Sequence, residues 1–156
     1  MRPAPAQRGF TMPELIAVIL IISVLAVVAL PRLDAALLLR TDTYRDQVIS
    51  ALRLAQHTAV SHRRLVCAQI ASQSVTLQIA PAQPATTCST TLAGSVGGAH
   101  AVSQGTTSTL SPSGTLFFQP SGRITNDGAG VTAGLWSVAI SGGTAITVTG
   151  ETGHVD

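Results

Sequence analysis

The chain has 156 residues, of which 46% are hydrophobic and only 10% are charged. This length suits one domain plus one further segment. The formal net charge is +2, and Arg2 and Arg8 account for it, because the other seven arginines balance seven acidic residues. Such a balance argues against a nucleic-acid-binding protein that relies on bulk positive charge.

The most distinctive stretch is an apolar run near the start of the chain. From Phe10 to Leu30 the single charged residue is Glu14. A helix rises about 1.5 Å per residue and a bilayer core is about 30 Å thick, so this run predicts a transmembrane helix over residues 10–31. An ionised carboxylate in hydrocarbon costs at least about 2.5 kcal/mol, and Glu14 therefore requires a partner and a role.

The segment Gly9-Phe10-Thr11-Met12-Pro13-Glu14 before a long apolar helix resembles the type III signal of type IV pilins and type II secretion pseudopilins. The resemblance implies a cytoplasmic leader over residues 1–9, cleavage by prepilin peptidase between Gly9 and Phe10, and N-methylation of Phe10. It also implies that Glu14 pairs with the amino terminus of a neighbouring subunit in a filament core. Pro13 replaces the aliphatic residue usual in the family, but a proline in the first helical turn removes an N–H that has no intrahelical partner.

Two other kinds of apolar segment would also fit the length of this run. A secretory signal peptide would end in small residues at its cleavage site, and Pro31-Arg32-Leu33-Asp34 lacks that pattern. A plain signal anchor stays open, although it explains neither Gly9-Phe10 nor Glu14.

The resemblance also implies partners and a location. The partners are other pilin or pseudopilin subunits, prepilin peptidase, the inner-membrane assembly platform and the membrane itself. The chain would cross the bacterial inner membrane once, place its C-terminal domain in the periplasm and enter a pilus or pseudopilus. No catalytic motif is found in the sequence, so we expect no enzyme, no cofactor and no metal site.

The apolar pattern predicts that the helix continues beyond the membrane segment. Pro31 lies inside it and predicts a kink near Val27–Pro31. Residues 32–62 form the amphipathic half, and the helix is expected to end near Val60–Arg63. Its apolar stripe predicts packing against a β-domain, and it is too short to favour a coiled coil; the stripe consists of Leu37, Tyr44, Val48, Leu52, Ala55 and Ala59.

Residues 63–156 predict a β-rich globular domain, and the fold class is therefore α+β, a long N-terminal helix packed on an antiparallel β-sheet domain. Alternating runs predict hairpins of residues 65–70 with 75–79, of 116–118 with 123–125, and of 135–140 with 144–149. Residues 85–113 are rich in Thr, Gly and Ser and predict a long loop with one or two short strands.

The two cysteines, Cys67 and Cys88, do not predict a zinc site. A closed site needs four ligands, and His57 and His62 are five residues apart, which puts them on different helix faces. In an exported domain the two cysteines favour a disulfide, and two free buried thiols remain the alternative.

The segment from Phe117 to Arg123 resembles a feature of H-type minor pseudopilins and FimT-type minor pilins. In FimT-type proteins a Gly-Arg-x-Arg turn is associated with DNA binding. Gly122 and Arg123 match it, but Thr125 replaces the second arginine, and one arginine provides one phosphate contact. Glu151-Thr152-Gly153 resembles the ending of minor pilins from mannose-sensitive haemagglutinin (MSHA) pilus clusters.

These observations predict a minor pilin or pseudopilin, a structural subunit assembled through its N-terminal helix. The alternative is a DNA-uptake or adhesive minor pilin that binds ligand through the loops around Arg123, with DNA as a partner. The turn Asn126-Asp127-Gly128 offers two oxygen-bearing side chains where calcium needs six to eight oxygens, so it predicts a bare turn.

Overall fold

A computed structural model describes residues 10–94 and 96–156, apart from the side chains of residues 28–38. Its contacts divide the chain into two units, one up to Leu37 and one from Leu38 to Asp156. The helix α1 (Met12–His62) belongs to both units, and ten strands follow it in the described residues. The two units are treated separately below.

In the first unit, α1 begins at Met12, two residues into the apolar run. Gly9 lies outside the described residues. The side chain of Pro31 also lies outside them, and the kink near Val27–Pro31 stays a prediction. A search of the described residues finds no helix that is both long and apolar enough to cross a membrane.

In the second unit, α1 presents one apolar face to the β-strands. Tyr44, Val48, Leu52, Ala55 and Ala59 are all buried in the same core cluster as residues from both sheets. Because these residues recur every three or four positions, they lie on one side of the helix. The predicted stripe is confirmed from Tyr44 onward, while Leu37 belongs to the part without described side chains.

The helix ends at His62, within the predicted range, through an unusual residue. Arg63 has φ 51°, in the left-handed region that glycine normally occupies. Its N–H donates to the carbonyl of Val60 (3.3 Å), and the N–H of Arg64 donates to that of Ala59 (3.2 Å). These two bonds form a Schellman motif, which satisfies carbonyls at the helix end without a glycine.

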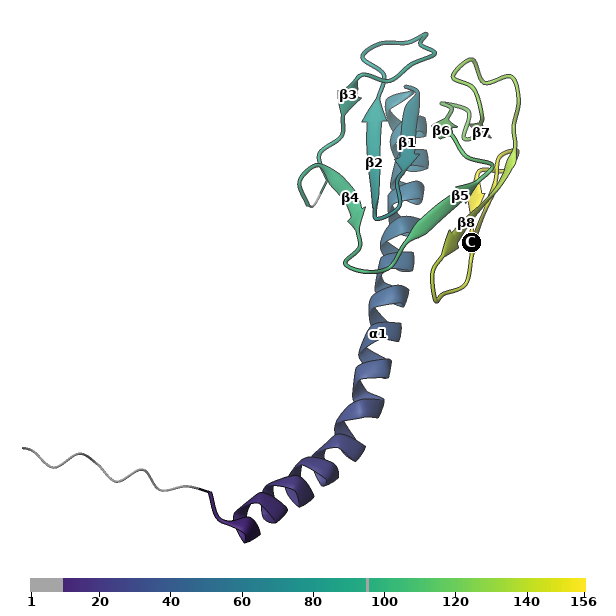
Figure 1. Cartoon of the computed structure of the whole chain (residues 1–156). Helices are drawn as coiled ribbons and strands as arrows, with labels where there is room; N and C mark the ends of the chain where they lie inside the picture. Colours follow the sequence, from purple (N-terminus) through teal and green to yellow (C-terminus); the bar gives the residue numbers. More distant parts are fainter. Residues whose placement is uncertain (1–9, 95) are drawn as a thin grey trace, which may run out of the picture. The chain divides into compact units, whose positions relative to one another are not determined.

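The first sheet contains β1 (Val66–Ile70), β2 (Ser74–Ile79), β3 (Thr90–Thr91), β4 (Ala99–Val102), β6 (Thr115–Phe118) and β7 (Ile124–Thr125). Its strand order is β3-β2-β1-β6-β7, and β4 pairs with the same edge of β2 as β3 but further along. All of these pairs are antiparallel. Figure 1 shows β1 and β2 running alongside the last turns of α1, which agrees with their shared core cluster.

The second sheet contains β5 (Ser108–Ser111), β8 (Leu135–Ile140), β9 (Ile146–Thr149) and β10 (His154–Val155), in the order β10-β9-β8-β5. Gly150 links it to the first sheet through backbone hydrogen bonds. The carbonyl of Gly150 accepts from the N–H of Ile124 in β7 (2.8 Å), and its own N–H donates to the carbonyl of Gly134, just before β8 (2.7 Å). Residues of both sheets belong to one buried hydrophobic cluster.

The predicted α+β class is confirmed, as are the three predicted hairpins. The predicted loop over residues 85–113 contains three short strands, β3, β4 and β5, rather than one or two. The strand β5 crosses to the second sheet and pairs with β8, which the sequence pattern did not predict. The strand β10 was also missed.

Candidate functional site

Phe10 and Glu14, two of the predicted processing and assembly residues, lie at the start of α1. The carbonyl of Thr11 accepts hydrogen bonds from the backbone N–H groups of Glu14 (3.1 Å) and Leu15 (3.2 Å). In return, Oε2 of Glu14 accepts from the backbone N–H of Thr11 at 3.5 Å. This is one half of a capping box, in which a glutamate three residues after the N-cap satisfies a free backbone donor.

The capping contact gives Glu14 a role within its own chain that sequence reasoning missed. Its signal was present, because Thr11-x-x-Glu14 is the capping-box spacing. The 3.5 Å separation is long for an N–H···O bond. Glu14 is also exposed, so its carboxylate remains accessible to another group.

Large apolar side chains surround the first turns of α1 on every side. From Phe10 to Val27 they remain between 42% and 79% exposed. Since one turn takes 3.6 residues, consecutive exposed residues from Ile19 to Ile22 cover the whole circumference. A helix that is apolar all round requires a partner around it, either lipid or other helices.

Ser23 is the one polar side chain in the middle of this exposed stretch. Its hydroxyl lies 2.9 Å from the carbonyl oxygens of both Ile19 and Leu20 on the preceding turn. A hydroxyl bonded to its own helix costs little in apolar surroundings, because its donor is already satisfied.

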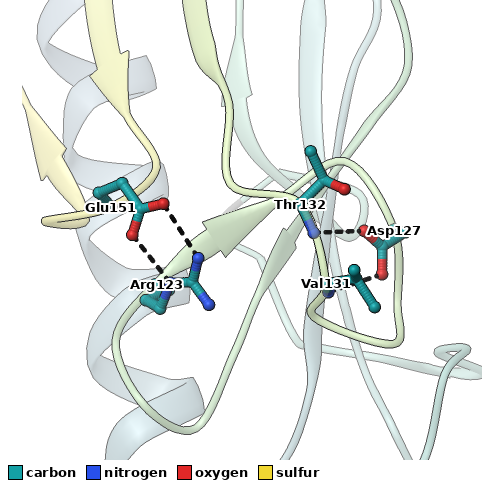
Figure 2. A network of polar contacts seen from close by, with 5 residues as sticks. All are labelled: Arg123, Asp127, Val131, Thr132 and Glu151. Atoms are coloured by element: carbon teal, nitrogen blue, oxygen red, sulfur yellow. Dashed lines mark hydrogen bonds and ion pairs between the residues drawn. The ribbon is translucent and has the colours of Figure 1, made fainter.

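The candidate ligand residue Arg123 is engaged within the chain. Its Nε donates to Oε2 of Glu151 (3.1 Å), and its Nη2 donates to Oε1 of the same carboxylate (3.0 Å), as Figure 2 shows. The side chains of Arg123 and Glu151 are 37% and 69% exposed. A two-point pair holds the guanidinium plane in place, although its exposure keeps the stabilisation small.

The turn before Arg123 is held from the helix. Gln119 and Gly122 close it, with the N–H of Gly122 donating to the carbonyl of Gln119 (2.9 Å), and Gly122 has φ 88°. Gln56 on α1 donates its side-chain Nε2–H to the carbonyl of Gly122 (3.2 Å). The C-terminal partner Glu151 could not be predicted from local pattern, because it lies 28 positions from Arg123.

Asp127 organises the loop after β7 through both of its carboxylate oxygens. Oδ1 accepts from the backbone N–H of Val131 (3.1 Å) and Oδ2 from that of Thr132 (3.0 Å), as drawn in Figure 2. Hydrogen bonds from Thr132 and Val131, in that order, lower the pKa of the Asp127 carboxyl below its ordinary value. Across the residues that the structure describes, no three His, Cys, Asp or Glu side chains gather as metal ligands.

Cys67 and Cys88 form a disulfide, with their Cα atoms 6.0 Å apart, and this expectation is confirmed. The bridge lies on the face of the first sheet opposite α1. There Leu65, Cys67 and Ala80 form a second buried cluster against Ala85 and Phe117. The disulfide thus fastens the segment after β2 over that face.

Comparison with known protein families gives one match. Residues 5–30, about a sixth of the chain, match the prokaryotic N-terminal methylation motif. This motif supports a type IV pilin-like precursor, the class that supplies structural subunits of pili and pseudopili rather than enzymes. It implies processing by prepilin peptidase, a membrane anchor and assembly with other pilins.

Neither the curated proteins nor the solved structures gave a match to the chain.

Proposed function

We propose that this chain is a minor pilin or pseudopilin, anchored in the bacterial inner membrane by residues 10–31 with its β-domain in the periplasm. Prepilin peptidase cleaves between Gly9 and Phe10 and methylates the new amino terminus. The subunit then enters a type IV pilus or a type II secretion pseudopilus through α1. The methylation motif over residues 5–30 supports this assignment.

The observation that carries the proposal is that exposed apolar side chains surround the helix from Phe10 to Val27, with one carboxylate in its first turn. Lipid covers such a helix in the membrane, and the apolar sides of other subunits replace lipid in a filament. The carboxylate of Glu14 lies four residues from the amine that cleavage would create. We infer that it pairs with the same amine on a neighbouring subunit.

The assignment to a minor subunit rests on composition. The chain carries few charges, and its β-domain includes a long segment of Thr, Gly and Ser with only short strands. The sequence likeness to H-type, FimT-type and MSHA minor subunits points the same way.

The amino terminus of the mature protein tests the proposal. Mass spectrometry of protein purified from its host membrane should find N-methylated Phe10 as the first residue. Gly9→Leu should leave the full-length precursor in the membrane, because a large side chain blocks approach to the bond before Phe10. Gly9→Ala is the matched control and should be cleaved more efficiently than Gly9→Leu. An intact Met1 start in the wild type contradicts the proposal.

The alternative, a minor pilin that binds DNA or a surface through the loops around Arg123, has less support. Glu151 neutralises Arg123 through two hydrogen bonds. A gel-shift titration with salt on the unit from Leu38 to Asp156 decides between the two. Binding that is lost in Arg123→Ala and strengthened in Glu151→Ala favours the alternative.

A further inference from the structure

His100 is the single titratable side chain in a long part of the chain. Residues 71–122 contain no Asp, Glu, Lys or Arg, and Cys88 within them is bridged. Among their side chains, only His100 can therefore change its charge between about pH 5 and pH 8. It belongs to β4, which lies at the edge of the first sheet with β2 as its strand partner (Figure 1).

His100 is also the extra residue of a β-bulge. Ala99 pairs with Thr76 of β2, and Ala101 pairs with Val75, the residue before it. His100, between the two alanines, therefore has no partner on β2. A bulge of this kind changes the direction of the side chain that it inserts.

His100 shares a cavity of about 250 Å³ with the helix. The other residues that line it are Ser50, Ala51 and Leu54 on α1 and Ala93 in the segment after β3. None of these four side chains carries a charge. A proton on the imidazole would thus face uncharged groups across the cavity.

The charged residues on either side of the cavity do not compensate a proton on His100. In the described residues, no hydrogen bond or ion pair joins Asp46, one turn before the cavity on α1, to His100. Arg53 is engaged elsewhere, because its Nη2 donates to the carbonyl of Val155 (3.0 Å). His57, one turn beyond the cavity, is exposed, and β2 and β3 contain no titratable residue.

Both ring nitrogens of His100 are buried and unsatisfied. The residue as a whole is half-buried, yet Nδ1 and Nε2 are shut off from solvent and have no hydrogen-bond partner in the described residues. A neutral imidazole carries one donor and one acceptor, and an imidazolium carries two donors. Burial without partners costs free energy in both forms, and more in the charged form. Burial accordingly lowers the pKa of the His100 imidazole below its ordinary value.

We propose that residues 99–103, which we name the edge segment, form a pH-sensitive closure on the first sheet: protonation of His100 releases this segment from α1 and β2. Release gives both ring nitrogens access to water, which can accept from the two donors of the imidazolium. The closed arrangement holds an uncharged imidazole, and the open arrangement holds either form.

Few contacts oppose the release of the edge segment. The N–H of Val102 donates to Oε1 of Gln47 on α1 (3.3 Å), and the N–H of Ser103 donates to the carbonyl of Gln73 (2.8 Å). The fully buried apolar side chains of β4 are two alanines, so little apolar area is exposed on opening. Segments with few buried apolar contacts open at a lower free energy than the rest of a domain.

Opening changes what the first sheet presents to other molecules. Without the edge segment, Ser74 to Thr76 of β2 have no strand partner on that side. A free strand edge can pair with an extended segment of another chain. The inference goes beyond the proposed function and does not rest on it, because every residue involved lies in the unit from Leu38 to Asp156.

Native-state hydrogen exchange of the full-length protein in detergent at pH 7.5 and pH 5.5 tests the inference. The open form takes up a proton that the closed form excludes, so the opening constant should rise by up to about tenfold between these values. The protection factors of the Val102 and Ser103 amides should fall by the same factor. The amide of Gly143, which bonds to the carbonyl of Ile140 in a separate turn, should keep its protection.

Three variants assign the effect to the imidazole. His100→Gln keeps a polar side chain that does not titrate, and it should lose the pH dependence at Val102 and Ser103. His100→Leu also removes the unsatisfied nitrogens, so its protection should exceed that of the wild type at both pH values. His57→Gln is the matched control, because it removes an exposed histidine of α1 and should keep the wild-type fall.

The inference is overturned by wild-type protection at Val102 and Ser103 that is the same at both pH values, or by a fall that persists in His100→Gln. Local opening also requires these two amides to be less protected than that of Ile124, which lies in β7. Equal protection at all three would show that the edge segment opens only when the whole domain unfolds, and the proposed closure would then be wrong.

Discussion

The hydroxyl groups of Tyr44 on α1 and Ser108 on β5 lie 2.9 Å apart in the core. The Ser108 hydroxyl also donates to the carbonyl of Ala71 (2.8 Å). Burial raises the pKa of the Tyr44 hydroxyl, and the Ser108 contact offsets part of that rise. The bond connects the helix, the second sheet and the turn between β1 and β2.

The raised pKa of Tyr44 predicts a loss of stability at high pH. Folded protein then holds a proton that unfolded protein releases above pH ~10, so the free energy of unfolding falls as pH rises through that value. The chain has one tyrosine and no lysine, and both cysteines are bridged. Thermal unfolding of the unit from Leu38 onward should show this loss in the wild type and little of it in Tyr44→Phe. Equal losses in both proteins would contradict the assignment.

Arg63 predicts a stabilising substitution. A residue other than glycine in the left-handed region costs about 1 kcal/mol or more, and glycine removes that cost at the expense of a more flexible unfolded chain. We expect Arg63→Gly to raise the unfolding midpoint by about 2–4 °C. Arg64→Gly removes the same charge one residue later without relieving φ, and it should lower the midpoint slightly. Calorimetry on the two variants decides.

The disulfide predicts a loss of stability on mutation or reduction. Closing a chain of 21 residues stabilises by about 3 kcal/mol in the chain-entropy model. Cys88→Ser should lower the free energy of unfolding by about that amount. Cys67→Ser should cost more, because Cys67 is buried and a hydroxyl there has to find a partner. Denaturant titration measures both, and an unchanged value for Cys88→Ser would refute the stabilising role.

Substitutions of Glu14 can separate the loss of its charge from the loss of its capping contact with Thr11. Glu14→Leu should be cleaved and stay in the membrane, yet fail to enter crosslinked assemblies. Glu14→Gln keeps an oxygen that can accept from the N–H of Thr11 but has no charge to attract an amine. At ~4 Å that attraction is worth about 4 kcal/mol at an effective dielectric near 20, so Glu14→Gln should fail like Glu14→Leu, and Glu14→Asp should be intermediate.

Assembly of Glu14→Gln at the wild-type level would change the interpretation of this residue. The local cap between Glu14 and Thr11 would then be the function of the side chain, and pairing with a neighbour would be excluded.

The sequence predicts those parts of the fold in which the spacing of apolar residues along the chain matches the positions that are buried. Hydrophobic periodicity predicts the helical stripe from Tyr44 to Ala59 and the strands around Val75 and Val138. In each of them large apolar residues recur at the period of the helix or strand that they form. The turn residues Gly142 and Gly143 likewise mark the last hairpin.

One of the missed elements, β5, is made largely of small polar residues. The strand β5 contains Ser108, which is buried because its hydroxyl finds two partners across the core. Sequence pattern treats such a residue as surface, since the partners become visible only after folding. The Arg123–Glu151 pair was missed for the same reason, as it joins positions far apart in the chain.

The backbone hydrogen bonds at Gly150 couple the local unfolding of the two sheets. The amide of Ile124 can exchange its proton only when its bond to Gly150 breaks, and the amide of Gly150 only when its bond to Gly134 breaks. These bonds follow one another from the first sheet to the second, so neither sheet can separate locally at this point. Native-state hydrogen exchange should therefore give Ile124 and Gly150 the same opening free energy, close to that of global unfolding. A mechanical force applied to either sheet is therefore transmitted to the other sheet.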